Sequence, residues 1–311
     1  MGITLLLRYK PPYDWGAMLS FLERRAIPGV ETVSVSTYTR AIEIDGSHGI
    51  VSVEPGTGHT LRVIVRGASL MPLPSIVGRV RRVFDLAADP EAIGGRLRED
   101  PVLAPLVVAR PGLRVPGAWD GFELAVRAVL GQQITVRAAV RLAGGLVAAY
   151  GQALEYAGRG IDGLTHLFPR PERLVTADLS ALGMPRSRAA AITALAAAVV
   201  SNPEVIGPGP TLDETIARLR GLAGVGEWTA QYIAMRALGE PDAFPAADVG
   251  LMRALTDQSG RRPTSTEVLK TAERWRPWRA YAAQHLWASL ATAQPDRGLG
   301  RARGKAQSFH R

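Results

Sequence analysis

The chain has 311 residues, enough for about two domains, of which 47% are hydrophobic and 21% are charged. This composition excludes disordered, collagen-like and fibrous proteins. The purest apolar run, residues 189–200, is twelve residues long, whereas a membrane span needs ~18. The apolar residues 3–7 are too few for the core of a signal peptide. We therefore expect a cytoplasmic protein with no membrane partner.

Cysteine is absent from the chain, which excludes disulfides, thiol nucleophiles, cysteine zinc sites and iron–sulfur clusters. The 5 histidines show no i, i+4 ligand spacing, so we expect no metal and no organic cofactor. The net charge of +9 fits an acidic polymer as partner. Nearly half of this charge lies in the last 21 residues. We expect residues 294–311 to form a basic, disordered tail that acts as an electrostatic tether.

Residues 1–112 show the alternation that is typical of a sheet, with turns predicted at Asp45-Gly46 and at residues 56–58. Two helices interrupt this pattern. Asp14 is a predicted N-cap for a helix over residues 15–25, and Ser75 precedes a helix over residues 76–84. We predict an N-terminal mixed α/β domain. The alternating apolar residues are Val33, Val35, Ile42, Ile44, Val51, Val53, Leu61, Val63 and Val65.

Residues 113–293 show helical runs separated by glycine and proline, which predicts an all-α domain. The fold class is therefore α+β. The helices are predicted near residues 120–130, 135–150, 164–168, 171–182, 186–200, 212–220, 227–238, 248–257, 265–275 and 278–292.

A turn with two glycines, residues 222–226, separates two of these helices. Glycines two apart allow positive φ and can present consecutive amides on one surface, where a DNA phosphate could bind. The predicted DNA contacts are Gly224, Val225, Gly226 and Thr229. A plain turn between helices, with no ligand, is the alternative interpretation.

The string LAGVGEWTAQYIAMRAL followed by GEPDAFPAADVGL, residues 222–251, resembles the helix-hairpin-helix motif of the DNA glycosylase superfamily. More narrowly, it is similar to the 3-methyladenine DNA glycosylase II family, the AlkA type. PPYDW at 11–15, AVLGQQ at 128–133, LGMP at 182–185 and AERWRPWR at 272–279 resemble further signatures of that family. The resemblance covers about residues 3–292. It implies a TATA-box-protein-like N-terminal domain and a helical body with two lobes around a cleft.

Cleavage of an N-glycosidic bond builds positive charge on the sugar, so the reaction needs a carboxylate near C1′. The resemblance implies that Asp248 is this catalytic residue. Its position after a Phe-Pro-Ala-Ala loop also fits a simple helix N-cap, and the two roles are compatible. Many members of the family have a second Asp just before the catalytic one, whereas this chain has Ala247.

Lyase activity in this superfamily needs a lysine in the second helix of the hairpin, where this chain has Trp228. We therefore expect a monofunctional enzyme that uses water. An N-alkylated purine is cationic and stacks well on aromatic rings, and the resemblance implies a base pocket formed by Trp228, Tyr232 and Trp287. Such a pocket would accept several alkylated purines. Trp275 and Trp278 are expected in the core.

The resemblance also implies a wedge that fills the space left by the flipped base, formed by Gln132 or Gln133, although some relatives have Leu at the position of Gln133. For Gln132 an exposed polar turn is an equal alternative. The predicted partner is double-stranded DNA with alkylated bases, bound in the bacterial nucleoid by a monomer. The hairpin carbonyls could hold a monovalent cation. The alternatives are a catalytically silent lesion-binding protein and a bifunctional oxidised-purine glycosylase.

Overall fold

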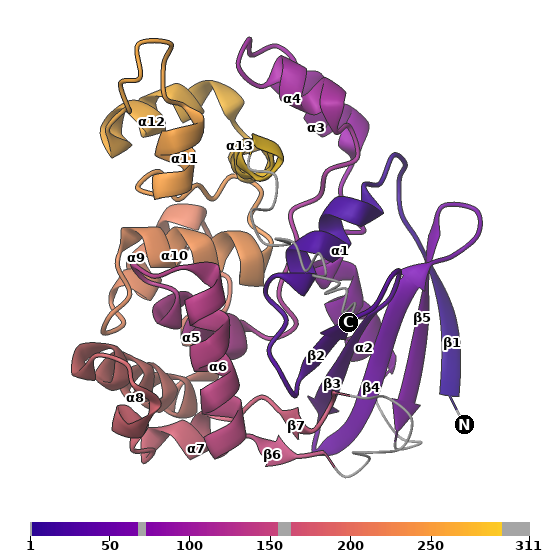
Figure 1. The fold of residues 1–311 in the computed structure, drawn as a ribbon, viewed down its shortest axis with the longest axis vertical. Coiled ribbons are helices and arrows are strands. Elements are labelled where there is room, and N and C mark those ends of the chain that lie inside the picture. Colours follow the sequence, from indigo (N-terminus) through magenta and orange to yellow (C-terminus); the bar gives the residue numbers. More distant parts are fainter. Residues whose placement is uncertain (1, 68–72, 155–162, 294–311) are drawn as a thin grey trace, which may run out of the picture.

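The computed structural model describes residues 2–67, 73–154 and 163–293. It has the predicted α+β fold, with a sheet domain beside a larger helical body (Figure 1). Within the described residues, no helix is long and apolar enough to cross a bilayer. The tail predicted over residues 294–311 lies outside the described residues.

The sheet has five antiparallel strands in the order β1-β5-β4-β3-β2. Its alternating apolar side chains face α1 (Trp15–Glu23) and α2 (Leu73–Val83), which cover one side of the sheet. Asp14 caps α1 as predicted, because its carboxylate accepts from the amide of Ala17 at 2.8 Å. The strands are β1 (Gly2–Arg8), β2 (Glu31–Val33), β3 (Tyr38–Ile44), β4 (Ser47–Pro55) and β5 (Thr60–Gly67).

A short two-stranded ladder, β6 (Gln152–Ala153) and β7 (His166–Leu167), covers part of the opposite side of the sheet. The helix predicted over residues 164–168 is therefore wrong. Leu164 and Leu167 pack with Ala41 and Ile50 from the sheet, so tertiary contacts determine the extended conformation here.

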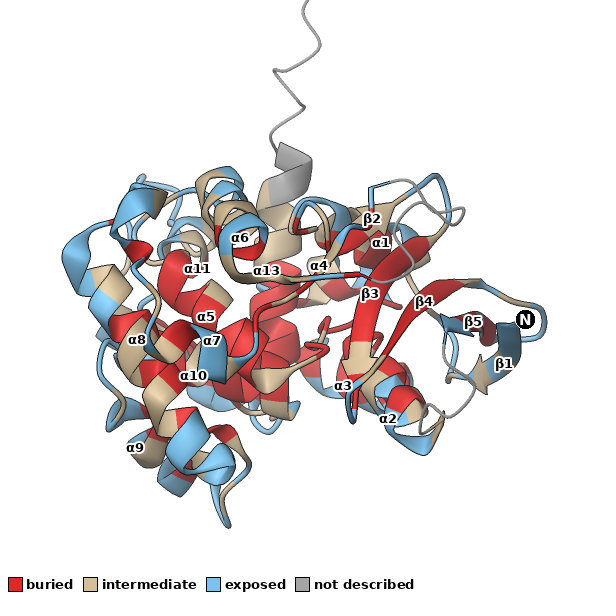
Figure 2. Cartoon of the chain, turned by 90° about the horizontal axis from the view of Figure 1, so that it is seen from below, coloured by how far each residue is buried: buried red, intermediate tan, exposed pale blue. Residues whose placement is uncertain are grey.

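The helical body is built around α5 (Gly121–Leu130), in which 8 of the 10 residues are buried. Figure 2 shows buried residues concentrated where the sheet meets this body. One lobe contains α5 to α10, and the other contains α11 to α13 together with α3 and α4, which lie earlier in the chain (Figure 1). The remaining helices are α3 (Pro90–Leu97), α4 (Ala104–Ala109), α6 (Val136–Tyr150), α7 (Pro171–Val175), α8 (Arg186–Ser201), α9 (Leu212–Arg220), α10 (Glu227–Ile233), α11 (Val249–Ala254), α12 (Ser265–Ala272) and α13 (Arg279–Ala293), and α10 continues as a π-helix over Ala234–Leu238.

Three further predictions differ from the structure. The helix predicted over 171–182 divides in two, because Asp178 caps a separate 3-10 turn by accepting from the amide of Ser180 at 3.0 Å. Ser75 does not precede α2 but lies inside it. Val35 is fully exposed and lies between β2 and β3. The strand β1 and the helices α3 and α4 were not predicted from the sequence pattern.

Candidate active site

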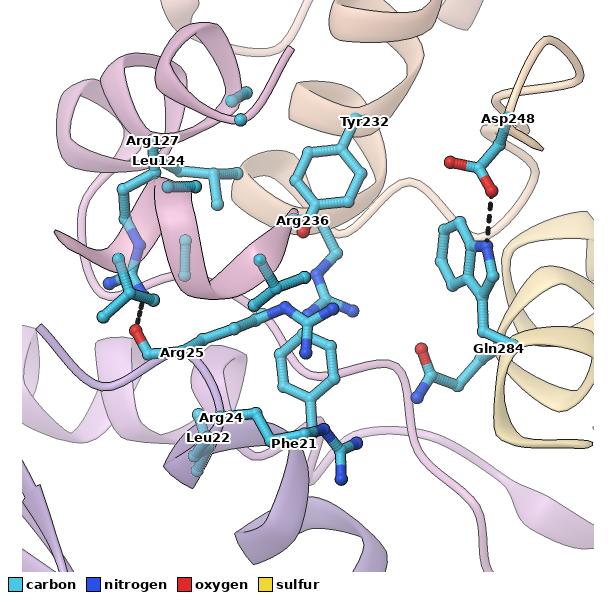
Figure 3. Close-up of a pocket in the computed structure, with 18 of the residues that line it drawn as sticks. Phe21, Leu22, Arg24, Arg25, Leu124, Arg127, Tyr232, Arg236, Asp248 and Gln284 are labelled. Carbon is cyan, nitrogen blue, oxygen red and sulfur yellow. Dashed lines mark hydrogen bonds between the residues drawn. The ribbon is translucent and has the colours of Figure 1, made fainter. Parts of the chain in front are cut away.

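A cleft of about 2050 Å³ lies where the sheet domain meets the two lobes of the helical body. Residues from α1, α5, the hairpin before α10, the cap of α11 and α13 line it. Figure 3 shows Asp248 at one side of this cleft and Tyr232 facing a group of arginines beside it. The sequence-predicted catalytic and pocket residues therefore lie together, although they come from three helical segments.

Asp248 is the N-cap of α11. Its Oδ1 accepts a hydrogen bond from the amide of Leu251 at 3.0 Å, so the capping role considered from the sequence is confirmed. Gly250 lies in the first turn of the helix, where an added Cβ would lie 2.8 Å from Asp248 Oδ1 and 3.1 Å from Trp287 Cδ1. A glycine at this position therefore lets the carboxylate and the indole approach one another.

Two indole N–H groups hold the Asp248 carboxylate from opposite elements. Trp228 Nε1 donates to Oδ2 at 2.9 Å, and Trp287 Nε1 donates to Oδ1 at 2.9 Å. An ionised carboxylate has about four acceptor positions. The two indoles and the Leu251 amide occupy three of them, which leaves one position on Oδ2 for a water molecule or a substrate. The carboxylate is thus fixed in orientation without being closed off, since Asp248 itself is half-buried.

The aromatic residues of the predicted pocket form a wall beside this carboxylate. Trp228 and Tyr232 are four residues apart in α10, and their rings stack with centroids 5.1 Å apart and an interplanar angle of 10°. Trp287 comes from α13 and lines the same cleft. Trp275, by contrast, is buried against Phe244 in the core, as predicted. The wall therefore offers apolar faces for a planar ligand next to a fixed negative charge.

Three residues that were not predicted from the sequence extend the aromatic wall on the side of Tyr232 away from Asp248. Phe21 and Arg25 come from α1 and the turn after it, and Arg236 comes from the π-helix. Both guanidinium groups lie over the Phe21 ring, with their central carbons 3.8 Å and 4.1 Å from its centroid. The spacing 228, 232, 236 places all three side chains on one helical face, and this signal could have identified Arg236.

The charges of these arginines act on their neighbours. Burial would raise the pKa of Tyr232, but the positive charges around it, with Arg236 foremost, lower that pKa overall. Burial also lowers the pKa of Arg236 to about 10, so its guanidinium remains charged at neutral pH. The region of the cleft beyond Tyr232 is therefore electropositive, whereas the side with Asp248 is electronegative.

The two glycines of the hairpin turn, residues 222–226, have different roles. Gly224 has a φ of +77°, and an added Cβ would lie 2.4 Å from the Ala191 side chain, so this position needs glycine for the fold. Gly226 has an extended backbone, is exposed, and an added Cβ would meet nothing within 4 Å. Val225 has a buried side chain, and its amide already donates to Leu222 O at 3.1 Å.

Thr229, which is predicted to contact DNA, has an inward-facing side chain. Its side chain is 2% exposed, and its hydroxyl accepts a hydrogen bond from Gln132 Nε2 at 3.0 Å. The same Gln132 amide donates to Gly224 O at 2.8 Å. The hydroxyl of Thr229 is therefore turned inward, where it fixes the hairpin to the loop after α5.

The two candidate wedge residues have different surroundings. Gln132 is held by the hairpin, whereas Gln133 is exposed and has a φ of +58°, a left-handed conformation that is uncommon outside glycine. Both line the cleft. Gln133 is thus the one whose side chain is available to a ligand. Among the described residues, no group of three or more His, Asp or Glu side chains could hold a metal ion.

Comparison with known proteins agrees with this architecture. Residues 4–120 match the model of the AlkA N-terminal domain, and residues 126–279 match the HhH-GPD superfamily of base excision DNA repair proteins. The chain is 40% identical to the probable bifunctional transcriptional activator/DNA repair enzyme AlkA of Mycobacterium tuberculosis over 93% of its own length. The chain spans only 57% of that relative.

A relative of similar size is DNA-3-methyladenine glycosylase 2 of Escherichia coli, which is 38% identical over 93% of this chain and 98% of its own length. Among solved structures, a 3-methyladenine DNA glycosylase from Archaeoglobus fulgidus shares the fold with a TM-score of 0.78, covering 92% of this chain and 97% of its own at 24% identity. The chain therefore belongs to the AlkA-type family of helix-hairpin-helix DNA glycosylases.

Proposed function

We propose that this protein is a monofunctional DNA glycosylase that releases alkylated purines of the 3-methyladenine and 7-methylguanine type by hydrolysing the N-glycosidic bond. The main supporting observation is the Asp248 carboxylate, held by two indole N–H groups at the side of a large cleft. A fixed carboxylate at this place can stabilise the positive charge that develops on the sugar. Family membership supports the same reaction.

In the proposed reaction, Asp248 acts both on the sugar and on the attacking water. As the bond between C1′ and the base breaks, its electron pair leaves with the base and the sugar becomes cationic. Asp248 stabilises this cation and orients a water molecule through its free acceptor position on Oδ2. The water adds to C1′ on the face opposite the departing base and loses a proton, either to Asp248 or to solvent.

The aromatic wall supports alkylated purines as substrates. A cationic base gains from stacking on Trp228, Tyr232 or Trp287, and a desolvated cation–π contact contributes up to ~2 kcal/mol. A cationic base is also a good leaving group, so the site needs no separate acid for it. A pocket lined by aromatic side chains selects its ligand by charge and shape more than by hydrogen bonds. Such selectivity is consistent with a broad range of alkylated bases.

A hydrolytic rather than a lyase reaction is supported by the residues around the cleft. Trp228 occupies the position of the lyase lysine and donates to Asp248. The structure describes two of the three lysines in the chain, Lys10 and Lys270, and neither of them lines the cleft. A Schiff-base intermediate would need such an amine.

For DNA binding, we propose that the backbone at Gly226 approaches a phosphate and that Gln133 fills the space left by the flipped base. Both are exposed beside the cleft, on the loops that Gln132 joins. A monomer acting on the bacterial nucleoid is sufficient for this mode of binding. A monovalent cation on the hairpin carbonyls stays a prediction.

The experiment that tests this function uses duplex DNA with a single 7-methylguanine or 3-methyladenine. The released base is identified by chromatography, and abasic sites are counted by alkaline cleavage. We expect free base, intact strands before alkali, and no adduct after borohydride treatment. Binding of the lesion without base release would instead support the silent lesion-binding protein, and a borohydride-trapped adduct would support a lyase.

A further inference from the structure

The first turn of α8 contacts the loop after α5, where the proposed wedge residue lies. Arg188 is not among the residues that line the cleft, but its Nη2 donates to Gln132 O at 2.5 Å. We propose that Arg188 is a positioning residue for base flipping: by holding this carbonyl, it sets the backbone conformation from which Gln133 enters the duplex. The inference rests on the proposed function and concerns how a lesion reaches the active site.

The loop after α5 has an uncommon backbone conformation. Gln133 has a φ of +58°, and this left-handed region is unfavourable for a residue with a Cβ. The turn hydrogen bonds within the loop are long compared with the usual ~2.9–3.0 Å. Gln132 N donates to Val129 O at 3.3 Å. Ile134 N donates to Gly131 O at 3.5 Å. A contact from outside the loop therefore has a large influence on its conformation.

The Arg188 contact acts directly on this conformation. The peptide group between Gln132 and Gln133 is planar, so fixing its carbonyl also fixes the N–Cα bond about which the φ of Gln133 is measured. A hydrogen bond from a guanidinium group is charge-assisted and stronger than one between neutral groups. Arg188 Nε is buried with no partner among the described residues, which carries a desolvation cost. The position of this side chain thus favours the loop conformation more than the stability of the fold.

The LGMP segment, residues 182–185, explains why α8 begins at this place. Gly183 has a φ of +70° and ends the preceding 3-10 turn, and Pro185 is the N-cap of α8. Met184, which lies between them, is buried in the core of the helical body. The chain therefore turns at a fixed point. This turn places Arg188 in the first turn of α8, which packs beside α5 (Figure 1).

The same face of α8 also contacts the hairpin. Ala191 follows Arg188 by three residues, and its side chain is what an added Cβ at Gly224 would meet at 2.4 Å. The Gln132 side chain in turn donates to Gly224 O and to the Thr229 hydroxyl. Arg188 therefore joins the wedge loop to the helix that supports the hairpin. A phosphate at the hairpin and a wedge in the duplex would be held in a fixed relative position.

The test is a double-mutant cycle on base flipping by the full-length protein. Arg188→Met removes the donor and keeps a long apolar stem, and it is combined with Gln133→Ala, which removes the proposed wedge. The matched control is Arg186→Met, because Arg186 lies in the same turn of α8 and is exposed. A fluorescent base analogue beside a single 7-methylguanine reports flipping in stopped-flow experiments at saturating protein.

We expect Arg188→Met to lower the flipping rate by about 10-fold when Gln133 is present, as for the loss of a hydrogen bond from a charged group. In the Gln133→Ala background, the same change should lower the rate by less than about 2-fold, because no wedge is left to position. The control should match its parent protein in both backgrounds. Arg188→Lys, which keeps a charged donor, should retain part of the rate.

The cycle separates positioning from a structural role, because a folding defect lowers the flipping rate by the same factor in both backgrounds. If Arg188→Met does not fold, Arg188→Lys in the two backgrounds provides the same comparison. Equal losses, or no loss from Arg188→Met alone, would overturn the inference and leave the proposed function intact, since base release is measured separately. A wild type that neither flips nor releases 7-methylguanine would overturn both.

Discussion

Trp287 Nε1 donates a hydrogen bond to Asp248 Oδ1 at 2.9 Å, and this contact joins α13 to the cap of α11. The residue proposed for base stacking is therefore also the residue that orients the proposed catalytic carboxylate. Trp228 likewise lines the pocket and donates a hydrogen bond to the other carboxylate oxygen, Oδ2. Each indole both lines the pocket and holds Asp248. A substitution that tests the hydrogen bond must therefore remove the N–H group and keep an aromatic ring.

Asp248→Asn should lower the single-turnover rate of base release by ~10² or more, which is at least ~2.7 kcal/mol of transition-state stabilisation. The amide keeps one oxygen for the Leu251 amide and the Trp287 indole, so folding and lesion binding should be retained. Its NH2 group would face the Trp228 N–H, however, which leaves two donors without an acceptor. Rapid-quench kinetics and thermal melts measure the two effects. Near wild-type rates would mean that Asp248 is only a helix cap.

Trp287→Phe and Trp228→Phe should each lower the rate by about 10-fold, because a hydrogen bond to a charged group contributes ~1.5–3 kcal/mol. Phenylalanine keeps a ring in the wall but has no N–H for the carboxylate. The control is Trp278→Phe, which removes an indole that packs against the core and does not line the cleft. The role of the N–H is contradicted if all three variants behave alike in single-turnover assays.

The two hairpin glycines should respond differently to alanine. Gly224→Ala forces a Cβ to within 2.4 Å of the Ala191 side chain at a positive φ, so we expect a loss of thermal stability. Gly226→Ala meets nothing within 4 Å and should melt like the wild type.

Gly226→Ala should nevertheless weaken DNA binding, and by a similar factor for every sequence and lesion, because a phosphate contact does not read the base. Binding isotherms on lesion-containing and undamaged duplexes measure this. A loss confined to one lesion would assign the hairpin to base recognition instead.

Gln133→Ala should slow base flipping while leaving the fold intact, because the side chain is exposed. Gln132→Ala should instead reduce thermal stability, since it removes the contacts to Gly224 O and the Thr229 hydroxyl that join the hairpin to the loop after α5. A fluorescent base analogue beside the lesion reports flipping. If Gln132→Ala slows flipping and stays stable while Gln133→Ala has no effect, the two assignments are reversed.

The local features of the site could be predicted from sequence. The caps at Asp14 and Asp248 and the stacking of residues 228 and 232 depend on neighbours within four positions. The position of Phe21 against Arg236 could not be predicted, because it joins segments more than 200 residues apart. The same reason explains β7, where contacts with the sheet outweigh the local helical pattern.

The edge strand β1 was missed for a different reason. Its apolar residues 3 and 5–7 are nearly continuous rather than alternating, and two of them, Ile3 and Leu6, are exposed. A pattern method that searches for alternation does not detect such a strand. Arg25 and Arg236 were missed because charged side chains usually face solvent.

Asp85→Asn should change the pH dependence of stability. Burial raises the pKa of Asp85 from 3.8 to about 6, despite the nearby Arg114 and hydrogen bonds from Val115 and Tyr281. The folded state therefore binds a proton more tightly than the unfolded state. This contribution to stability is present below pH 3.8 and is lost as the pH rises through about 6. The shift of about two pKa units corresponds to roughly 3 kcal/mol.

Asparagine does not titrate, tolerates the positive φ of 51° at this position, and can still bond to the Tyr281 hydroxyl. We therefore expect Asp85→Asn to gain roughly 2 to 3 kcal/mol relative to the wild type between pH 4 and pH 8, as measured by urea unfolding. The buried His285, whose pKa is lowered to about 4 by burial and by Arg110, titrates in both proteins and cancels in the difference. Parallel pH profiles for the two proteins would show that Asp85 is ionised in the folded state at all these pH values.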